Sequence, residues 1–119
     1  MKILITIDDY SVTATLEDNT TSRDFLAMLP LQLELRDFAS SEKIADLPQR
    51  LSTQDAPAGY KPKAGDITLY APWGNLAIFY RSAPYASGLV RLGKIDDDDS
   101  IDRLARLTDT SSVRIELRQ

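Results

Sequence analysis

Five aromatic residues crowd one short segment of the chain: Tyr70, Trp73, Phe79, Tyr80 and Tyr85. Aromatic rings bury large apolar areas, and the Tyr hydroxyl and the Trp N–H need hydrogen-bond partners when they are buried. Such rings therefore either fill a core or line a groove for a ligand. Phe79 and Tyr80 are neighbours in an apolar run that is typical of a strand, so their side chains point to opposite faces. Trp73 lies in a predicted turn, where core packing and ligand contact both stay open.

Two arginines border apolar segments of the chain. Arg91 stands between Val90 and Leu92, and Arg81 follows the apolar run that ends at Tyr80. A guanidinium among apolar residues is costly unless it is paired or bound to an anion. Arg91 either binds a ligand carboxylate or prolyl carbonyl, or it lies on an exposed strand face or in an ion pair with Glu42. Arg81 has the same alternatives, or simply begins a loop.

Several kinds of catalytic and metal site are excluded by composition. The chain has no histidine and no cysteine, which removes the commonest general base, the thiolate nucleophile and the Cys-based zinc site. Ser87 lacks the first glycine of a nucleophile elbow. The four aspartates at 96–99 do not fit a calcium loop, since no glutamate stands at the twelfth position. We expect no metal and no cofactor, and we expect these aspartates to precede a helix, whose N-terminus favours negative charge.

Length and charge place the chain in a broad class. Its 119 residues predict one domain, residues 1–119, and the 43% hydrophobic and 27% charged fractions are typical of a globular protein. Fourteen Lys and Arg against eighteen Asp and Glu give a net charge of −4, which argues against a nucleic-acid partner. No segment approaches the roughly 20 apolar residues that span a bilayer. We therefore expect a cytoplasmic protein without a membrane association.

The elements that must position these residues are mostly strands. Alternating or continuous apolar runs predict strands over residues 2–8, 11–16, 31–36, 65–71, 76–80, 89–95 and 112–118. The last of these places Val113, Ile115 and Leu117 inside, and Gly93 marks a bulge in the sixth. One short helix is expected between Asn19 and Pro30, and a second over residues 100–107, with Ser100 as its N-cap.

Two segments carry no clear periodicity. Residues 38–63 contain three prolines and one glycine, and residues 83–88 are also irregular, so both are predicted as loops. The strands follow one another at hairpin spacing rather than alternating with helices. This pattern predicts a mostly β protein, a closed antiparallel barrel with two short helices at its open ends.

One block carries a family resemblance. It reads Gly65-Asp66-Ile67, then Tyr70-Ala71-Pro72-Trp73-Gly74-Asn75-Leu76-Ala77-Ile78-Phe79-Tyr80, and Gly88-Leu89-Val90-Arg91-Leu92-Gly93 follows it. Upstream, Glu42-Lys43-Ile44-Ala45, Leu47-Pro48 and Leu51-Ser52 extend the match over essentially the whole chain. The block resembles the signature of small bacterial cyclophilin-like proteins. The resemblance implies an eight-stranded cyclophilin-type barrel, in a family whose function is largely uncharacterised.

The resemblance to the cyclophilin isomerases is weaker. Their Phe-His-Arg segment, which carries the catalytic guanidinium, has no counterpart, and their Gly-Gly-Asp turn is matched only by Ala64-Gly65-Asp66. Catalytic residues therefore stay unknown.

Three functions remain open. The first is a module that binds a peptide or small molecule in an aromatic-lined cleft. The second is a peptidyl-prolyl cis–trans isomerase that uses Trp73, Phe79 and Arg91. The third is a protein partner of a larger enzyme, because relatives of this barrel form parts of multi-subunit amidohydrolases. The residues expected to line the cleft are Glu42, Tyr70, Trp73, Phe79, Tyr80, Tyr85 and Arg91.

Overall fold

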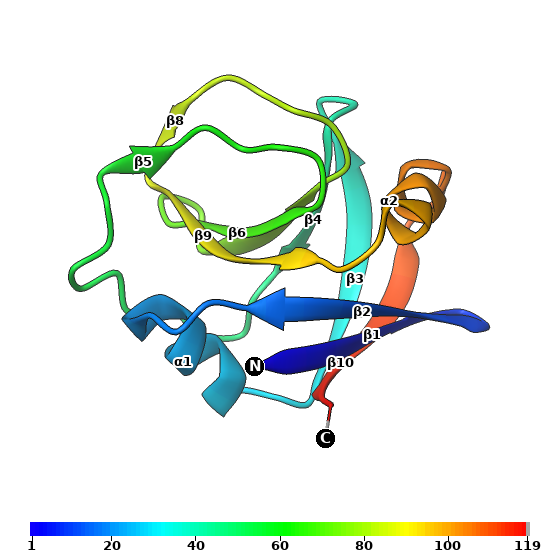
Figure 1. The fold of residues 1–119 in the computed structure, drawn as a ribbon, viewed down its shortest axis with the longest axis horizontal. Helices are drawn as coiled ribbons and strands as arrows, with labels where there is room; N and C mark the ends of the chain where they lie inside the picture. The colour runs from blue at the N-terminus through cyan, green and yellow to red at the C-terminus, as the bar shows by residue number, and fades with distance from the viewer. Residues whose placement is uncertain (119) are drawn as a thin grey trace.

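Eight antiparallel strands close into a barrel in the computed structural model, which describes residues 1–118. They follow one another around the wall in the order β1-β10-β3-β4-β7-β6-β9-β2 (Figure 1). The predicted closed antiparallel barrel with two helices is thus confirmed. The strands are β1 Lys2–Ile7, β2 Tyr10–Leu16, β3 Leu31–Phe38, β4 Glu42–Asp46, β6 Asp66–Tyr70, β7 Asn75–Phe79, β9 Leu89–Ile95 and β10 Ser111–Leu117.

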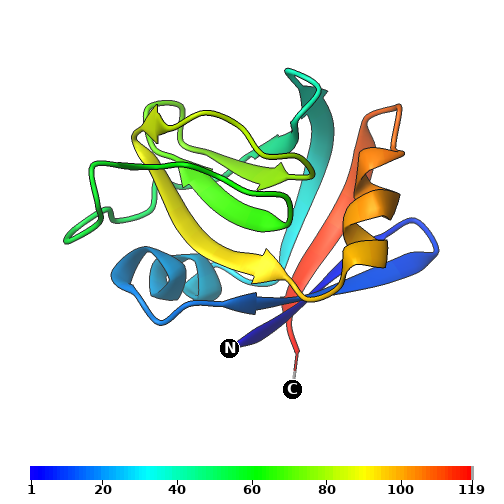
Figure 2. The ribbon, with the colours of Figure 1, turned by 45° about the horizontal axis from the view of Figure 1, so that its top comes forward.

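Two helices of eight residues lie on opposite sides of the molecule, α1 Thr20–Ala27 and α2 Asp98–Ala105 (Figures 1 and 2). Each sends one buried apolar side chain into the barrel core, Phe25 from α1 and Leu104 from α2. Within the described residues, neither helix has the length and apolar character needed to cross a bilayer.

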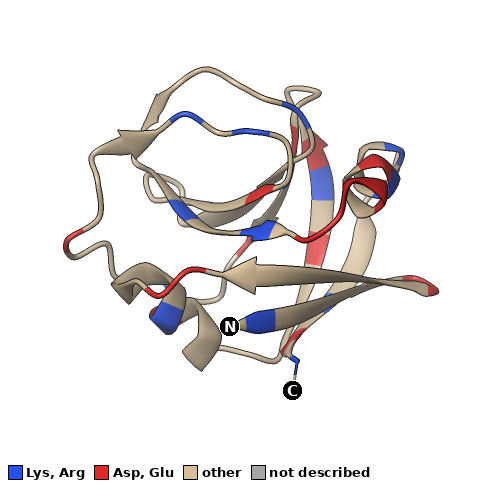
Figure 3. Ribbon diagram, viewed as in Figure 1, with Lys and Arg blue, Asp and Glu red and all other residues tan. Residues whose placement is uncertain are grey.

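The aspartates at 96–99 lie at the start of α2. Asp97 accepts a hydrogen bond from the Ser100 backbone N–H, 3.0 Å away, so the predicted N-cap at Ser100 is wrong and Asp97 has that role. Figure 3 shows the acidic residues gathered at this end of the helix, where they face its positive pole. Asp96 instead pairs with Lys2 at 2.9 Å. No group of three or more acidic side chains in residues 1–118 is arranged to hold a metal ion.

Apolar residues form two separate clusters, one inside the barrel and one outside its wall. The outer cluster consists of Ile44, Ala77, Phe79 and Leu89. Strand β7 contributes to both, since its five residues are all buried. The prediction of a strand buried on both faces is confirmed, and the outer cluster explains it: the wall is covered here from outside.

The cover is an arch that the sequence did not predict. Strand β5, Gly59–Tyr60, pairs with β8, Ala86–Ser87, in a small second sheet. We call residues 59–63 and 83–88 together the arch; it stands beside β6 and β9 in both views (Figures 1 and 2). The prediction of irregular loops at 38–63 and 83–88 is therefore wrong where β4, β5 and β8 form.

Gly93 allows two strands to approach each other closely. The register between β6 and β9 shifts between Ile67 and Thr68, which leaves Leu92 as an extra residue in β9. This confirms a bulge beside Gly93. A Cβ on Gly93 would lie 2.1 Å from the backbone oxygen of Thr15 in β2. Only glycine therefore fits at this point of the seam between β9 and β2.

The first and last strands of the chain pair with each other. Ile5 stands opposite Ile115, and the Arg118 N–H donates to the Lys2 carbonyl at 3.0 Å. Val113 and Ile115 are buried as predicted, but Leu117 is 51% exposed because it lies at the end of the strand.

Candidate functional site

A pocket of about 320 Å³ lies outside the barrel wall, between the wall and the arch. We call it the aromatic pocket. It takes side chains from the outer face of β4, β6, β7 and β9, from the end of β3, and from the arch. Its lining residues are Phe38, Glu42, Ile44, Pro62, Tyr70, Trp73, Asn75, Phe79, Ala83, Pro84, Ala86 and Leu89.

Strand register explains why these residues share a face. Glu42 stands opposite Phe79 across β4 and β7, and Tyr70 stands opposite Asn75 across β6 and β7. Successive side chains of a strand alternate between faces, so Asn75 and Phe79, four residues apart, point the same way. The two pairs therefore mark the two ends of the floor of the pocket.

Three rings form one wall of the pocket. The Trp73 ring contacts Phe38 edge to face, at 5.6 Å between centroids and 88° between planes. It contacts Tyr70 in the same manner at 5.4 Å and 84°. Trp73 is nevertheless 60% exposed, so it does not pack in the core and that alternative is wrong. An exposed indole held by two other rings presents a rigid apolar surface at the pocket mouth.

Two polar groups of the aromatic pocket, Glu42 and Asn75, are poorly satisfied by their surroundings. Glu42 forms no ion pair within residues 1–118, and its one hydrogen bond, from the Ser41 hydroxyl, is long at 3.4 Å. Burial raises the pKa of the Glu42 carboxyl above its usual value, and the nearby Asp37 charge raises it further. Asn75 is only 2% exposed, and its side-chain oxygen has no hydrogen-bond partner among the described residues 1–118.

Two predicted cleft residues lie outside this pocket. Tyr80 follows Phe79 and points to the other side of the wall, where its hydroxyl donates to Asp37. Asp37 also pairs with the buried Lys43 at 3.1 Å, and Arg81 stands over the Tyr80 ring at 5.7 Å. Tyr85 is 57% exposed. It follows Pro84 in the arch without lining the pocket itself.

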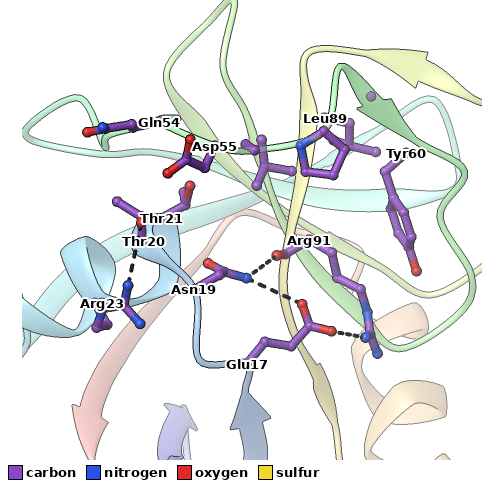
Figure 4. A pocket seen from close by; sticks show the side chains of 14 residues that line it. Glu17, Asn19, Thr20, Thr21, Arg23, Gln54, Asp55, Tyr60, Leu89 and Arg91 are labelled. Atoms are coloured by element: carbon purple, nitrogen blue, oxygen red, sulfur yellow. Dashed lines mark hydrogen bonds and ion pairs between the residues drawn. The ribbon is translucent and has the colours of Figure 1, made fainter.

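Arg91 also lies elsewhere, in a second and more polar pocket of about 490 Å³ (Figure 4). Its guanidinium pairs with Asp66 at 3.1 Å and with Glu17 at 2.5 Å. Of the alternatives left open for Arg91, an ion pair within the protein is the one found, but its partners are Asp66 and Glu17 rather than Glu42. This polar pocket also takes residues from the start of α1 and from the arch, among them Asn19 and Tyr60.

Asp66 holds the arch and the polar pocket together. It is 4% exposed and accepts hydrogen bonds from the Tyr60 hydroxyl at 2.6 Å and from the Lys63 backbone N–H at 2.8 Å. Its other oxygen accepts from Arg91. This buried carboxylate thus joins β5, β6 and β9. The ion pair with Asp66 gives Arg91 a structural role.

We expect two tyrosines, Tyr60 and Tyr80, to ionise at a higher pH than a free tyrosine does. Burial, and then the carboxylate that each hydroxyl contacts, raise the pKa of Tyr60 and of Tyr80 from 10.0 to about 12. Folding holds these phenols neutral, so their stabilising contribution is complete below pH 10 and is lost between about pH 10 and pH 12. Urea unfolding along this pH range measures the loss. It should be smaller in the Tyr60→Phe and Tyr80→Phe variants, and an unchanged pH dependence in both would contradict the assignment.

Seven residues were predicted from the sequence to line one cleft. Four of them line the aromatic pocket in the structure: Glu42, Tyr70, Trp73 and Phe79. The prediction missed Phe38 and Asn75. Asn75 had a signal, since it ends the Pro-Trp-Gly-Asn turn beside Trp73. Phe38 had none, because the strand that carries Glu42 beside it was predicted as a loop.

Comparison with known proteins places this geometry in a family. The sequence profile described as the Cyclophilin-like family matches residues 5–116. The solution structure of a hypothetical protein from Archaeoglobus fulgidus is similar, with a TM-score of 0.66 and 18% identity, over 98% of this chain and 93% of that one. McbB, solved in complex with tryptophan, has a TM-score of 0.74 and 15% identity. This chain is covered to 98% in that match and spans only 44% of McbB. No curated protein is significantly similar in sequence.

Proposed function

This chain belongs to the Cyclophilin-like family, and from that premise we propose that it binds a peptide or small-molecule ligand in the aromatic pocket. The family description states a fold and no activity, so the proposal depends on the site. The single observation that carries it is the exposed Trp73, which two neighbouring rings hold at the mouth of an apolar hollow. An exposed apolar surface beside a concave pocket is typical of a binding site.

The size and lining of the pocket support this proposal. A volume of about 320 Å³ lies at the small end of the range that ligand pockets have. Most of the lining is aromatic or aliphatic, and the Glu42 carboxylate and the Asn75 amide can fix the orientation of a ligand. McbB, which shares the fold, has been solved with a small aromatic molecule, tryptophan. That precedent agrees with a small ligand without identifying one.

The chain contains a single tryptophan, so the indole of Trp73 reports on this pocket alone. We expect a ligand from a panel of small aromatic molecules and proline peptides to raise the melting temperature and to shift the one indole N–H signal in an NMR spectrum. Trp73→Ala should weaken binding at least about tenfold, as the loss of a central aromatic contact does. Because Trp73 is exposed, the variant should stay folded.

Tyr85→Ala is the matched control, since it removes an exposed ring outside the pocket. Calorimetry should find its affinity unchanged. A panel that leaves both the melting temperature and the indole signal unmoved would overturn the proposal.

An isomerase remains the alternative function. Weakening the resonance of a prolyl amide needs a donor beside the apolar pocket, and the sequence offered Arg91. In the structure Arg91 is bound to Asp66 and Glu17 in the polar pocket, while Trp73 and Phe79 line the aromatic pocket. No Lys or Arg within residues 1–118 lines the aromatic pocket. Ligand binding without chemistry is therefore the function that the geometry supports better.

A further inference from the structure

Two side chains of the aromatic pocket, Glu42 and Asn75, carry acceptor oxygens whose hydrogen-bonding capacity the described residues leave largely unfilled. Glu42 is the one charged side chain among the described residues that line the pocket. Its one hydrogen bond among the described residues comes from the Ser41 hydroxyl at 3.4 Å, longer than a good hydrogen bond between oxygens. A half-buried carboxylate without a cation is unfavourable, and a cation brought by a ligand relieves this cost.

Asn75 presents an acceptor for a definite reason. Its side-chain nitrogen donates to the Leu76 carbonyl at 3.1 Å, so the nitrogen must face that carbonyl and the oxygen must face away from it. The oxygen is buried and has no partner within residues 1–118. Buried acceptors in folded proteins almost always receive a hydrogen bond. A ligand in the pocket with an N–H or O–H group can supply it once a small movement of the Asn75 side chain uncovers the oxygen.

The rings around the pocket favour the same sign of charge. Trp73, Tyr70 and Phe38 turn aromatic surface to the cavity, and aromatic faces attract organic cations. The nearby Asp37 is already paired with the buried Lys43, so the charge that the pocket presents is that of Glu42. An anionic ligand would meet the Glu42 charge with no Lys or Arg among the described lining residues to offset it.

The two acceptors lie at opposite ends of the pocket. Glu42 stands opposite Phe79, and Asn75 lies four residues from Phe79 along β7, which is about 13 Å between the Cα atoms. One ammonium group therefore does not satisfy both acceptors. A ligand that does so has an ammonium at one end, a second donor at the other, and an apolar body between them.

We propose that the aromatic pocket binds a small organic amine in its protonated form, with the ammonium at Glu42 and a hydroxyl or amide donor at Asn75. The apolar body of this ligand lies against Trp73 and Phe79. The proposal rests on the proposed function, since it takes this pocket as the ligand site, and it adds the chemical class of the ligand.

Four probes of one shape test the proposal. Tyramine has both donors, phenethylamine has only the ammonium, para-ethylphenol has only the hydroxyl, and para-hydroxyphenylpropionate replaces the ammonium by a carboxylate. Titrations followed by the indole N–H signal of Trp73 and by calorimetry should rank tyramine first and phenethylamine second. Tyramine should bind at least about tenfold more tightly than para-ethylphenol, and the carboxylate should bind most weakly.

Two variants assign the contacts. Glu42→Gln should weaken tyramine and phenethylamine about tenfold and leave para-ethylphenol unchanged, because it removes only the charge. Asn75→Ala should bring the affinities of tyramine and phenethylamine together. If that variant does not fold, the preference of the native protein for tyramine over phenethylamine still tests the Asn75 contact. Glu34→Gln, an exposed carboxylate of β3 outside the pocket, is the matched control and should change nothing.

The outcomes separate this inference from the proposed function. Equal affinity for tyramine and para-ethylphenol, or tight binding of the carboxylate probe, would overturn the amine class while leaving a ligand site in place. Binding of a proline peptide with a blocked N-terminus but of no amine would do the same. No response of the indole signal to any probe or peptide would overturn both.

Discussion

Gly93→Ala should destabilise the barrel by about 3 kcal/mol or more, the largest effect that we expect from any single methyl group in this chain. The added Cβ would lie 2.1 Å from the Thr15 oxygen and 2.8 Å from the Leu16 Cα. Both are backbone atoms, so no side-chain rotation relieves the clash. Strand β2 has to move away from β9, and this opens the seam at which the barrel closes. Urea unfolding of the two proteins measures the difference.

Gly74→Ala is the matched control for this substitution. Gly74 has φ +65°, but a Cβ there would meet nothing closer than the Arg50 side chain at 3.9 Å. Only the left-handed backbone conformation penalises alanine at this turn, by about 1 kcal/mol. A Gly93→Ala variant as stable as Gly74→Ala would show that β2 and β9 are not held as closely as described.

Asp66→Ala should lower the free energy of unfolding by about 3 kcal/mol, because it removes one partner of a buried ion pair and leaves the other charge in place. The substitution removes the acceptor for the Tyr60 hydroxyl and the Lys63 N–H, and it leaves Arg91 with Glu17 alone. We expect the arch to loosen from the wall, so backbone amides of residues 59–63 should exchange with solvent faster than in the native protein. The pKa of Tyr60 should fall from about 12 toward its ordinary value, since its carboxylate partner is gone.

Asp46→Ala provides the comparison. Its carboxylate is 79% exposed and lies 3.6 Å from Arg36, so the variant should lose less than about 0.5 kcal/mol. Urea unfolding of both variants and hydrogen exchange of the arch are the measurements. Equal losses in stability, or an arch whose exchange is unchanged, would contradict the role given to Asp66.

The barrel was predictable because its strands carry their own periodicity. In β3 the alternation from Leu31 to Arg36 matches the observed burial, residue by residue. The arch and β4 were not predictable in the same way. Strand β5 has only two residues and forms because its partner β8 is brought to it by the chain between them. The prolines of residues 38–63 hid β4, although they stand outside that strand.

The candidate site was half predictable for a related reason. The alternation of side chains along a strand correctly predicted that Phe79 and Tyr80 face opposite sides of the barrel wall. The same alternation could not predict that Arg91 and Trp73 line different pockets, since both side chains lie outside the barrel. The arch makes that separation: Gly59 and Tyr60 line the polar pocket, whereas other arch residues line the aromatic pocket. No local pattern in the sequence reports how a distant segment divides a surface.

Strands β1 and β10, the first and last along the chain, are neighbours in the barrel wall. Lys2 and Arg118 are joined by a backbone hydrogen bond, so strands β1 and β10 bring these two residues side by side (Figure 1). A short flexible linker can therefore connect them, and new termini can be opened at an exposed bend such as Gln54–Asp55, away from the aromatic pocket. We expect that the barrel can be circularly permuted, or inserted as a cassette into a surface loop of another protein, with the aromatic pocket left accessible.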